Sequence, residues 1–186
     1  MDSLNILLEK AKEFHGDICP GIATGTRMTI AGMRELGMDP LTHNRDLIVY
    51  VEIDRCATDA IQAITGCTLG HKTLKQLNYG KFAATFIDTR TGKAVRIATY
   101  PKKPDQPSDM NELKEMILTA PEKELFSIQQ VSVDIPEGDM PGFPTSITTC
   151  SRCGEQIMDG KEVVSNNTLF CKNCVGDSYY KRINAE

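Results

Sequence analysis

The chain has 186 residues and a net charge of −4, with 40% hydrophobic and 25% charged residues. This composition is that of a globular protein, and it excludes disorder as the main state. The excess of acidic residues argues against a general affinity for the phosphates of nucleic acids. No hydrophobic run approaches the roughly 20 residues of a membrane span, and the N-terminus lacks the pattern of a secretion signal. We therefore expect a cytoplasmic protein without a membrane segment.

Two helices are predicted at the start of the chain. Apolar residues at helical spacing predict the first over residues 4–14, and Pro20 marks the start of a second that ends near Leu36. The second helix is rich in glycine, alanine and threonine, so it can pack very closely against a sheet or a partner chain.

The elements that follow are shorter. They are, in chain order, a strand over residues 47–53, a helix capped by Thr58 or Asp59 and ended by Gly66, a helix over residues 71–77, two strands over residues 82–87 and 94–99 joined by a hairpin turn, a polar amphipathic segment over residues 111–126, and a strand over residues 128–135.

A change in composition marks the domain boundary. Seven of the nine prolines lie between Pro101 and Pro144. Residues 136–146 contain proline, glycine and aspartate without any period, which is typical of an extended linker. We expect a domain over residues 1–135, this linker, and a small second domain over residues 147–186.

The second domain contains four cysteines at a spacing typical of a metal site. Cys150 and Cys153 form one C-x-x-C pair, Cys171 and Cys174 form another, and 17 residues separate the pairs. Four thiolates match the tetrahedral preference of zinc, as in zinc ribbons and treble clefs. A block of about 40 residues cannot bury enough apolar surface to fold alone, so the metal would supply much of its folding free energy.

Alternatives to zinc remain open at this stage. Iron accepts the same four thiolates, whereas disulfides require an oxidising compartment that nothing in the sequence indicates. From Cys150 onward the chain has five basic and five acidic residues, a balance that argues against nucleic acid as the partner of this module. A stabilising or docking role is the simpler interpretation.

The first domain contains a second group of metal-ligand residue types. His15 and Cys19 flank the start of the second helix, where free N–H groups stabilise a thiolate, and Asp17 lies between them. Cys56 follows a predicted strand, and Cys67 lies in a turn flanked by glycines. Three protein ligands with one open position are typical of a catalytic or substrate-binding metal. Taken one at a time, each residue is equally compatible with a structural role in the core.

Three segments resemble signatures of the FmdE family, which is named for the FmdE subunit of formylmethanofuran dehydrogenase. Residues 14–27, FHGDICPGIATGTR, resemble the opening motif of the family. Residues 56–70, CATDAIQAITGCTLG, resemble its second signature, and residues 78–81, NYGK, resemble its third. Many members also carry a C-terminal four-Cys zinc ribbon, so the resemblance extends over almost the whole chain.

The resemblance implies an α+β fold, with a mixed sheet covered by helices and followed by the zinc module. It also implies a homodimer and a site around His15, Cys19 and Cys56, with Cys67 nearby. Asp17 stands where the family often has His, and it would replace that residue as a harder donor. His71 stands where the family often has Lys, so its role does not carry over.

Three functions compete on this basis. The favoured one is an accessory or subunit-like metal-binding protein of one-carbon redox metabolism, with a structural zinc, a second divalent metal and a protein partner. The second is an enzyme in which Cys19 or Cys56 is the nucleophile and His15 the base. The third is an adaptor that docks a protein or nucleic acid through the zinc module. The sequence does not decide whether the chain is catalytic, and it names no substrate, second metal or partner.

Overall fold

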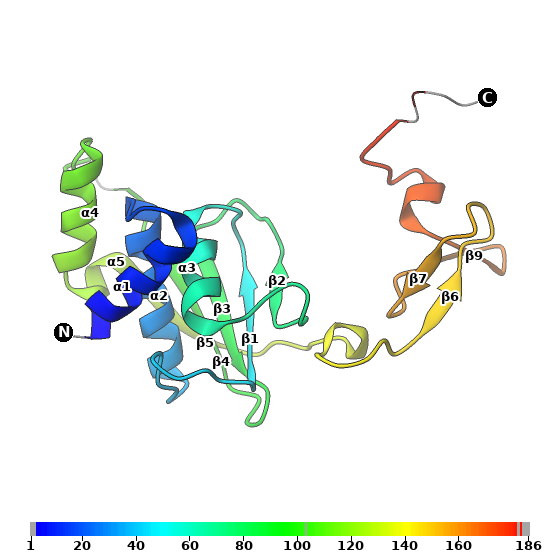
Figure 1. Ribbon diagram of the computed structural model, residues 1–186, viewed down its shortest axis with the longest axis horizontal. Coiled ribbons are helices and arrows are strands. Elements are labelled where there is room, and N and C mark those ends of the chain that lie inside the picture. The colour runs from blue at the N-terminus through cyan, green and yellow to red at the C-terminus, as the bar shows by residue number, and fades with distance from the viewer. Residues whose placement is uncertain (1–2, 103, 182, 184–186) are drawn as a thin grey trace. The chain divides into compact units, whose positions relative to one another are not determined.

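The computed structural model describes residues 3–102, 104–181 and 183. The chain forms two compact units, Met1–Asp134 and Ile135–Glu186. The first unit is built around one sheet with several helices, and the second contains two short hairpins (Figure 1). Within the described ranges, no helix combines the length and the hydrophobicity needed to cross a bilayer.

The N-terminal unit contains a five-stranded sheet in the order β2-β1-β3-β4-β5. Strands β1 and β2 are parallel and the other neighbours are antiparallel, which confirms the predicted α+β fold with a mixed sheet. The elements are α1 (Ser3–His15), α2 (Pro20–Glu35), β1 (Leu47–Val51), α3 (Cys56–Thr65), β2 (Leu74–Gln76), β3 (Ala83–Asp88), β4 (Ala94–Thr99), α4 (Met110–Thr119), α5 (Glu122–Leu125) and β5 (Phe126–Val131).

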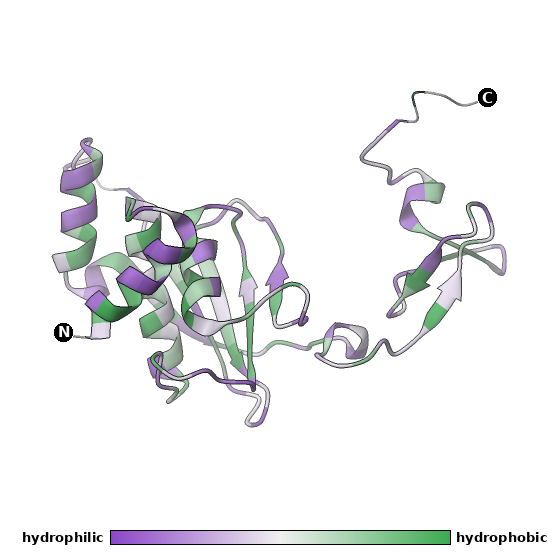
Figure 2. Cartoon of the chain, in the orientation of Figure 1, coloured by the Kyte–Doolittle hydropathy of each residue, from purple (hydrophilic) through white to green (hydrophobic). Residues whose placement is uncertain are grey.

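The core lies between the sheet and the helices. Helices α1, α2 and α3 stand on one side of the sheet (Figure 1). Val49 in β1 pairs with Phe86 in β3, and Phe86 pairs with Val95 in β4, so all three side chains face the same way and all are fully buried. The strands are mostly apolar or neutral, whereas α1 and α4 show alternating hydrophilic and hydrophobic bands (Figure 2). These helices therefore have one face suited to water.

Helix α2 approaches its neighbours through glycines. A methyl group on Gly25 would lie 2.5 Å from the backbone oxygen of Ala57 in α3. A methyl group on Gly32 would lie 2.3 Å from the ring of Phe86. The expectation of a closely packed second helix is thus confirmed, and it packs against α3 and the sheet of its own chain.

The helix predicted over residues 71–77 is wrong. The chain turns at Thr68, whose carbonyl accepts hydrogen bonds from the N–H groups of Thr73 and Leu74. Leu74 then begins β2, which pairs parallel with β1 and buries the Leu74 side chain. Burial against the existing sheet thus outweighs the local helical pattern.

The start of α3 also differs from the prediction. The helix begins at Cys56 after Arg55, which provides no side-chain cap. Thr58 does not cap, because its hydroxyl donates to the carbonyl of Ile53. The end is as predicted, at Gly66 with a left-handed φ of 72°. Further along, the amphipathic segment divides into α4 and α5, and β5 begins at Phe126, two residues before the predicted start.

A buried ion pair lies on the sheet face opposite the helices. Arg96 stands between Val95 and Ile97 in β4, and alternation along a strand places it on the other face. Its Nε and Nη2 atoms donate to the two carboxylate oxygens of Glu52 at 2.6 and 2.8 Å. Because Glu52 is only 6% exposed, each charge depends on the other for solvation.

The C-terminal unit has almost no hydrophobic core. Among its described residues only Cys150 and Ile157 are buried. A 3-10 helix within residues 136–146 contacts the later strands, because Asp139 pairs with Lys161 at 2.8 Å. Its elements are η1 (Glu137–Asp139), β6 (Ile147–Thr149), β7 (Gln156–Met158), β8 (Val163–Ser165), β9 (Thr168–Phe170) and η2 (Lys172–Val175), with the predicted hairpin around Asn166 and Asn167 formed by β8 and β9.

The contact between α2 and α3 generates a first prediction. Replacing Gly25 with Ala should lower the free energy of unfolding by about 1–3 kcal/mol, because the added methyl group forces the two helices apart. Alanine normally favours a helix over glycine by about 0.5–1 kcal/mol, so a loss measured in urea denaturation reports the packing. Gly70→Ala is the control, since nothing lies within 4 Å of the added methyl group. Equal stability of both variants would contradict the close contact.

The Glu52–Arg96 pair generates a second prediction. The hydrogen bond from Arg96 lowers the pKa of Glu52 below its usual value. The pair therefore stabilises the fold above the pKa of glutamate in the unfolded chain, and this contribution is lost as the pH falls through the lower folded pKa. Glu52→Gln should cost about 1–3 kcal/mol at pH 7 and should flatten the loss of stability below pH about 5. An unchanged pH profile in urea denaturation would refute this role.

Candidate metal centres

Two groups of metal-ligand side chains converge in the described part of the chain. One consists of Cys150, Cys153, Cys171 and Cys174, and the other of His15, Cys19 and Cys56. In each group the candidate ligand atoms all lie within 4.8 Å of one another.

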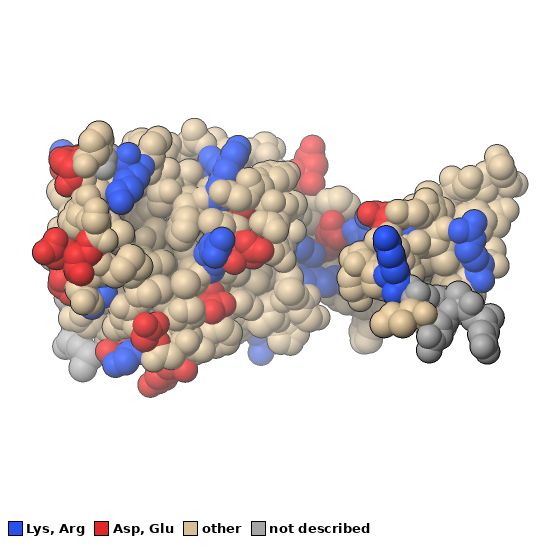
Figure 3. All heavy atoms as spheres, turned by 90° about the horizontal axis from the view of Figure 1, so that it is seen from above, with Lys and Arg blue, Asp and Glu red and all other residues tan. Residues whose placement is uncertain are grey.

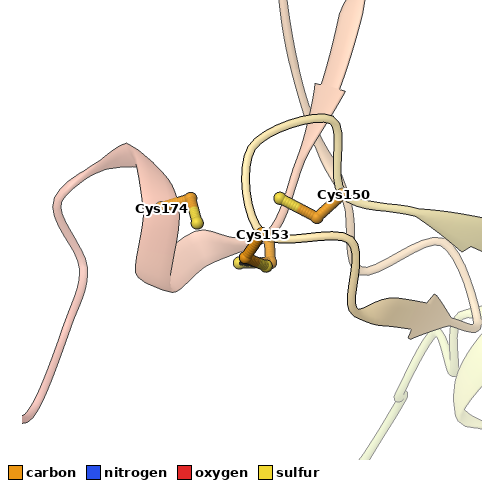
Figure 4. Close-up of side chains that lie close together, drawn as sticks. Cys150, Cys153 and Cys174 are labelled. Carbon is orange, nitrogen blue, oxygen red and sulfur yellow. Dashed lines mark hydrogen bonds between the residues drawn. The ribbon is translucent and has the colours of Figure 1, made fainter.

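The four cysteines lie on two turns of the C-terminal unit. Cys150 follows β6 and Cys171 follows β9, so each C-x-x-C segment begins where a hairpin strand ends. Gly154 and Gly176 come shortly after the pairs with φ values of 76° and 108°, which let the chain turn back sharply. Figure 4 shows Cys150, Cys153 and Cys174 pointing toward a common centre, and the sulfurs of Cys153 and Cys171 are 3.9 Å apart.

The electrostatics of these four thiols require a cation. Backbone N–H groups of Cys153 and Cys171 lower the pKa of Cys150 to about 6. Hydrogen bonding to the neighbouring sulfur of Cys171 raises the pKa of Cys174 to about 12. Four negative thiolates at this separation repel one another, and a divalent ion at their centre removes the repulsion. The donor set and the tetrahedral arrangement fit a structural zinc ion.

Contacts between the hairpins hold the two turns together. The N–H of Ser151 donates to the carbonyl of Leu169 at 2.9 Å. Arg152 lies over the ring of Phe170, 5.5 Å from its centroid, and its guanidinium donates to the carbonyl of Cys174. One arginine of the first turn thus contacts both the strand and the turn that carry the second cysteine pair.

The other cluster is assembled from the ends of three helices. His15 is the last residue of α1, and Cys56 is the first residue of α3. Cys19 is the N-cap of α2, where its sulfur accepts a hydrogen bond from the N–H of Ile22 at 3.4 Å. The free N–H groups of that first helical turn favour the thiolate form of Cys19.

Gly21 allows the two cysteines to approach. A methyl group on Gly21 would lie 2.8 Å from Cβ of Cys56 and 3.5 Å from the sulfurs of Cys19 and Cys56. Any larger residue at this position would push α3 away from the start of α2. The glycine of the C-P-G motif is therefore part of the construction of the cluster.

His15 presents one ring nitrogen to the sulfurs. Its Nε2 atom lies 4.0 Å from the Cys19 sulfur, and its Nδ1 atom lies 2.8 Å from a carboxylate oxygen of Asp59. Histidines that bind metals commonly donate the second nitrogen to a carboxylate, which fixes the tautomer and the ring. Sequence reasoning considered Asp59 only as a helix cap. Its position three residues after Cys56, on the same face of α3, was the signal for this role.

The thiol of Cys56 stays protonated more readily than an ordinary cysteine. Burial raises the pKa of Cys56, and hydrogen bonding to Cys19 adds to the rise. Cys56 and Asp59 also line a pocket of about 500 Å³, together with Arg55 and residues near β2. A small molecule in this pocket would reach both the sulfur and the carboxylate.

Two of the proposed cleft residues are not brought into the cluster. Cys67 is buried among the side chains between α2 and the sheet, and its thiol donates to the carbonyl of Leu47 at 3.5 Å. It lies beyond the end of α3, whereas Cys56 is at the start, so the length of the helix separates them. Asp17 is 3.8 Å from Nε2 of His15, but its side chain is 76% exposed. His71, exposed, bonds to the Thr68 hydroxyl at 3.0 Å.

Two family models match the chain. The model described as "FmdE, Molybdenum formylmethanofuran dehydrogenase operon" matches residues 14–132. The model described as "Prokaryotic dksA/traR C4-type zinc finger" matches residues 143–180. The first match includes all three residues of the N-terminal cluster, and the second includes all four cysteines of the C-terminal cluster.

A curated relative aligns with nearly the whole chain. A protein of Archaeoglobus fulgidus described as a probable S-adenosyl-L-methionine-binding protein is 32% identical over 207 aligned positions. The alignment covers 95% of this chain but 54% of that protein, so the chain spans about half the length of this curated relative.

The fold also matches a solved structure. A crystal structure of a tungsten formylmethanofuran dehydrogenase FmdE-like protein from Syntrophus aciditrophicus superposes with a TM-score of 0.66. The sequences are 24% identical, and the match covers 97% of this chain and 96% of that one. The family model spans more than half of the sequence and contains the cluster of His15, Cys19 and Cys56, and the chain therefore belongs to the FmdE family, with a C4-type zinc finger after the FmdE domain.

Proposed function

We propose that this chain is an accessory metal-binding protein that carries two metal ions, a structural zinc ion and a second divalent ion held by His15, Cys19 and Cys56. The observation that carries the proposal is the meeting of one imidazole and two thiols from three separate helix ends. The helices are already packed against one another, so the three donors are positioned before any metal binds.

The donor set suits a soft divalent metal. Two thiolates and one imidazole satisfy zinc or a related ion, and they leave one position of a tetrahedron to water or a ligand. Asp59 supplies the outer carboxylate that orients His15. The pocket of about 500 Å³ beside Cys56 gives a small molecule access to that open position. The site is thus built to present a metal to a ligand.

The family name suggests the metabolic setting. We place the chain with the one-carbon redox chemistry of formylmethanofuran dehydrogenase, as a factor that works beside the enzyme. A protein is the expected partner. Basic and acidic side chains are interspersed on the face of the N-terminal unit seen in Figure 3, which is unlike the concentrated positive charge that binds nucleic acid. The homodimer stays a prediction.

An enzyme with a cysteine nucleophile is less well supported. A reactive thiol requires a lowered pKa, whereas burial raises that of Cys56. The Nε2 atom of His15 is 4.0 Å from the Cys19 sulfur, too far for efficient proton transfer without rearrangement. Metal coordination gives both thiols a role that agrees with their shared position.

Metal counting tests the proposal directly. The purified protein should contain two metal ions per chain by plasma mass spectrometry. A Cys19→Ser/Cys56→Ser variant should contain one, because only the zinc finger remains, and a Cys150→Ser/Cys153→Ser variant should lose the structural zinc. Cys67→Ala is the matched control and should keep both ions, since Cys67 lies away from the cluster. One ion per chain in the unaltered protein, also after incubation with excess zinc, would refute the second site.

Removal of zinc should affect the two units differently. The C-terminal unit buries only Cys150 and Ile157 among its described residues, so it has little besides the metal to keep it folded. A strong chelator should make this unit rapidly cleavable by trypsin, while a fragment that corresponds to the N-terminal unit survives. Re-addition of zinc should restore protection. A C-terminal unit that resists trypsin after verified zinc loss would show that the metal is not its main support.

A further inference from the structure

The N-terminal unit contains a cavity that neither metal centre uses. It has a volume of about 410 Å³ and lies between the first turn of α2, helix α4 and the ends of β4 and β5. Binding sites for small molecules commonly measure about 300–1,000 Å³ and are mostly apolar with a few polar groups. The size of this cavity therefore suits a small organic molecule.

The walls of the cavity are largely apolar. Phe126 from β5 and Ile117 from α4 are buried, with 3% and 8% of their surface exposed. Leu113 and Met116 also line the cavity from α4 but are only half-buried. Ile117 is the single fully buried residue of this helix. A ligand with an apolar body would cover Leu113 and Met116 and complete the packing of α4.

Helix α4 is held over the cavity by one arginine of α2. The Nη1 atom of Arg27 donates to the carbonyls of Ile117 and Ala120, both at 2.6 Å. These are carbonyls of the last helical turn and its C-cap, which have no partner within the helix. The wall is thus fixed in place without a ligand, and the cavity is already formed in the free protein.

Two opposite charges also line the cavity. Lys102 follows β4, and Glu124 lies in α5. Within residues 3–102, 104–181 and 183, neither side chain forms an ion pair or a side-chain hydrogen bond. An ammonium and a carboxylate on the same cavity complement a ligand that carries both charges in the reverse order.

We propose that this cavity binds a small zwitterion with an apolar body, such as a molecule with an amino acid end and an aliphatic or aromatic remainder. The carboxylate of the ligand pairs with Lys102, its ammonium pairs with Glu124, and its apolar body lies against Leu113 and Met116. Gly21 lines the cavity and also lies beside the sulfurs of Cys19 and Cys56, so the ligand sits next to the metal-binding cluster. The proposal does not depend on a metal being bound there.

Three probes of equal chain length test the charges. In titration calorimetry, 2-aminooctanoate carries both charges, octanoate only the negative one and octylamine only the positive one. The zwitterion should bind about two- to fivefold more tightly than either, which is the range of exposed ion pairs. Lys102→Gln should remove its advantage over octylamine, and Glu124→Gln its advantage over octanoate. Equal or tighter binding of a singly charged probe to the unaltered protein would overturn the zwitterion assignment.

A filled cavity tests the location. Met116→Trp places a large ring among the lining residues and should weaken 2-aminooctanoate binding at least tenfold. Asn111→Trp, at an exposed position of the same helix, should leave it unchanged. Circular dichroism confirms that both variants are folded. The Cys19→Ser/Cys56→Ser variant should bind the probe as the unaltered protein does, which separates this proposal from the second metal site. No saturable binding of any probe, or full binding by Met116→Trp, would refute the cavity as a ligand site.

Discussion

The close contact of α2 with its surroundings is the constraint on which the N-terminal unit depends. Gly25 lets the helix rest on the backbone of α3, and Gly32 lets it rest on the ring of Phe86. A third glycine, Gly21, brings the beginnings of the two helices together. Because the helix has no side chain at these points, its axis cannot shift or rotate without a clash or a void. The relative position of Cys19 and Cys56 follows from this packing.

Much of the fold was accessible from the sequence because local signals and tertiary burial agree. The Pro20 start, the Gly66 stop and the alternating apolar residues of the β3–β4 hairpin all correspond to observed elements. The failures have the opposite origin. Residues around Leu74 have a helical pattern, but the open edge of β1 offers them a ladder of backbone hydrogen bonds. Single-sequence periodicity contains no information about such a long-range partner.

The sites show the same division. The four cysteines of the zinc finger were predictable because two C-x-x-C turns encode their own geometry. His15, Cys19 and Cys56 required knowledge of how helix ends meet, which the resemblance supplied and periodicity did not. Cys67 looked equally suitable by residue type, yet α3 carries it to the far end of the helix. The contribution of Asp59 was hidden for a related reason, since only the folded structure shows that it faces His15.

The scarcity of buried residues in the C-terminal unit ties its existence to the zinc supply of the cell. Ligand binding to the folded state alone adds to stability in proportion to the logarithm of free ligand, so each tenfold fall in free zinc removes about 1.4 kcal/mol from this unit. The N-terminal unit, with its own core, carries no such debt to the metal. Starvation for zinc would therefore leave a chain whose FmdE domain persists while its tail becomes a substrate for proteases.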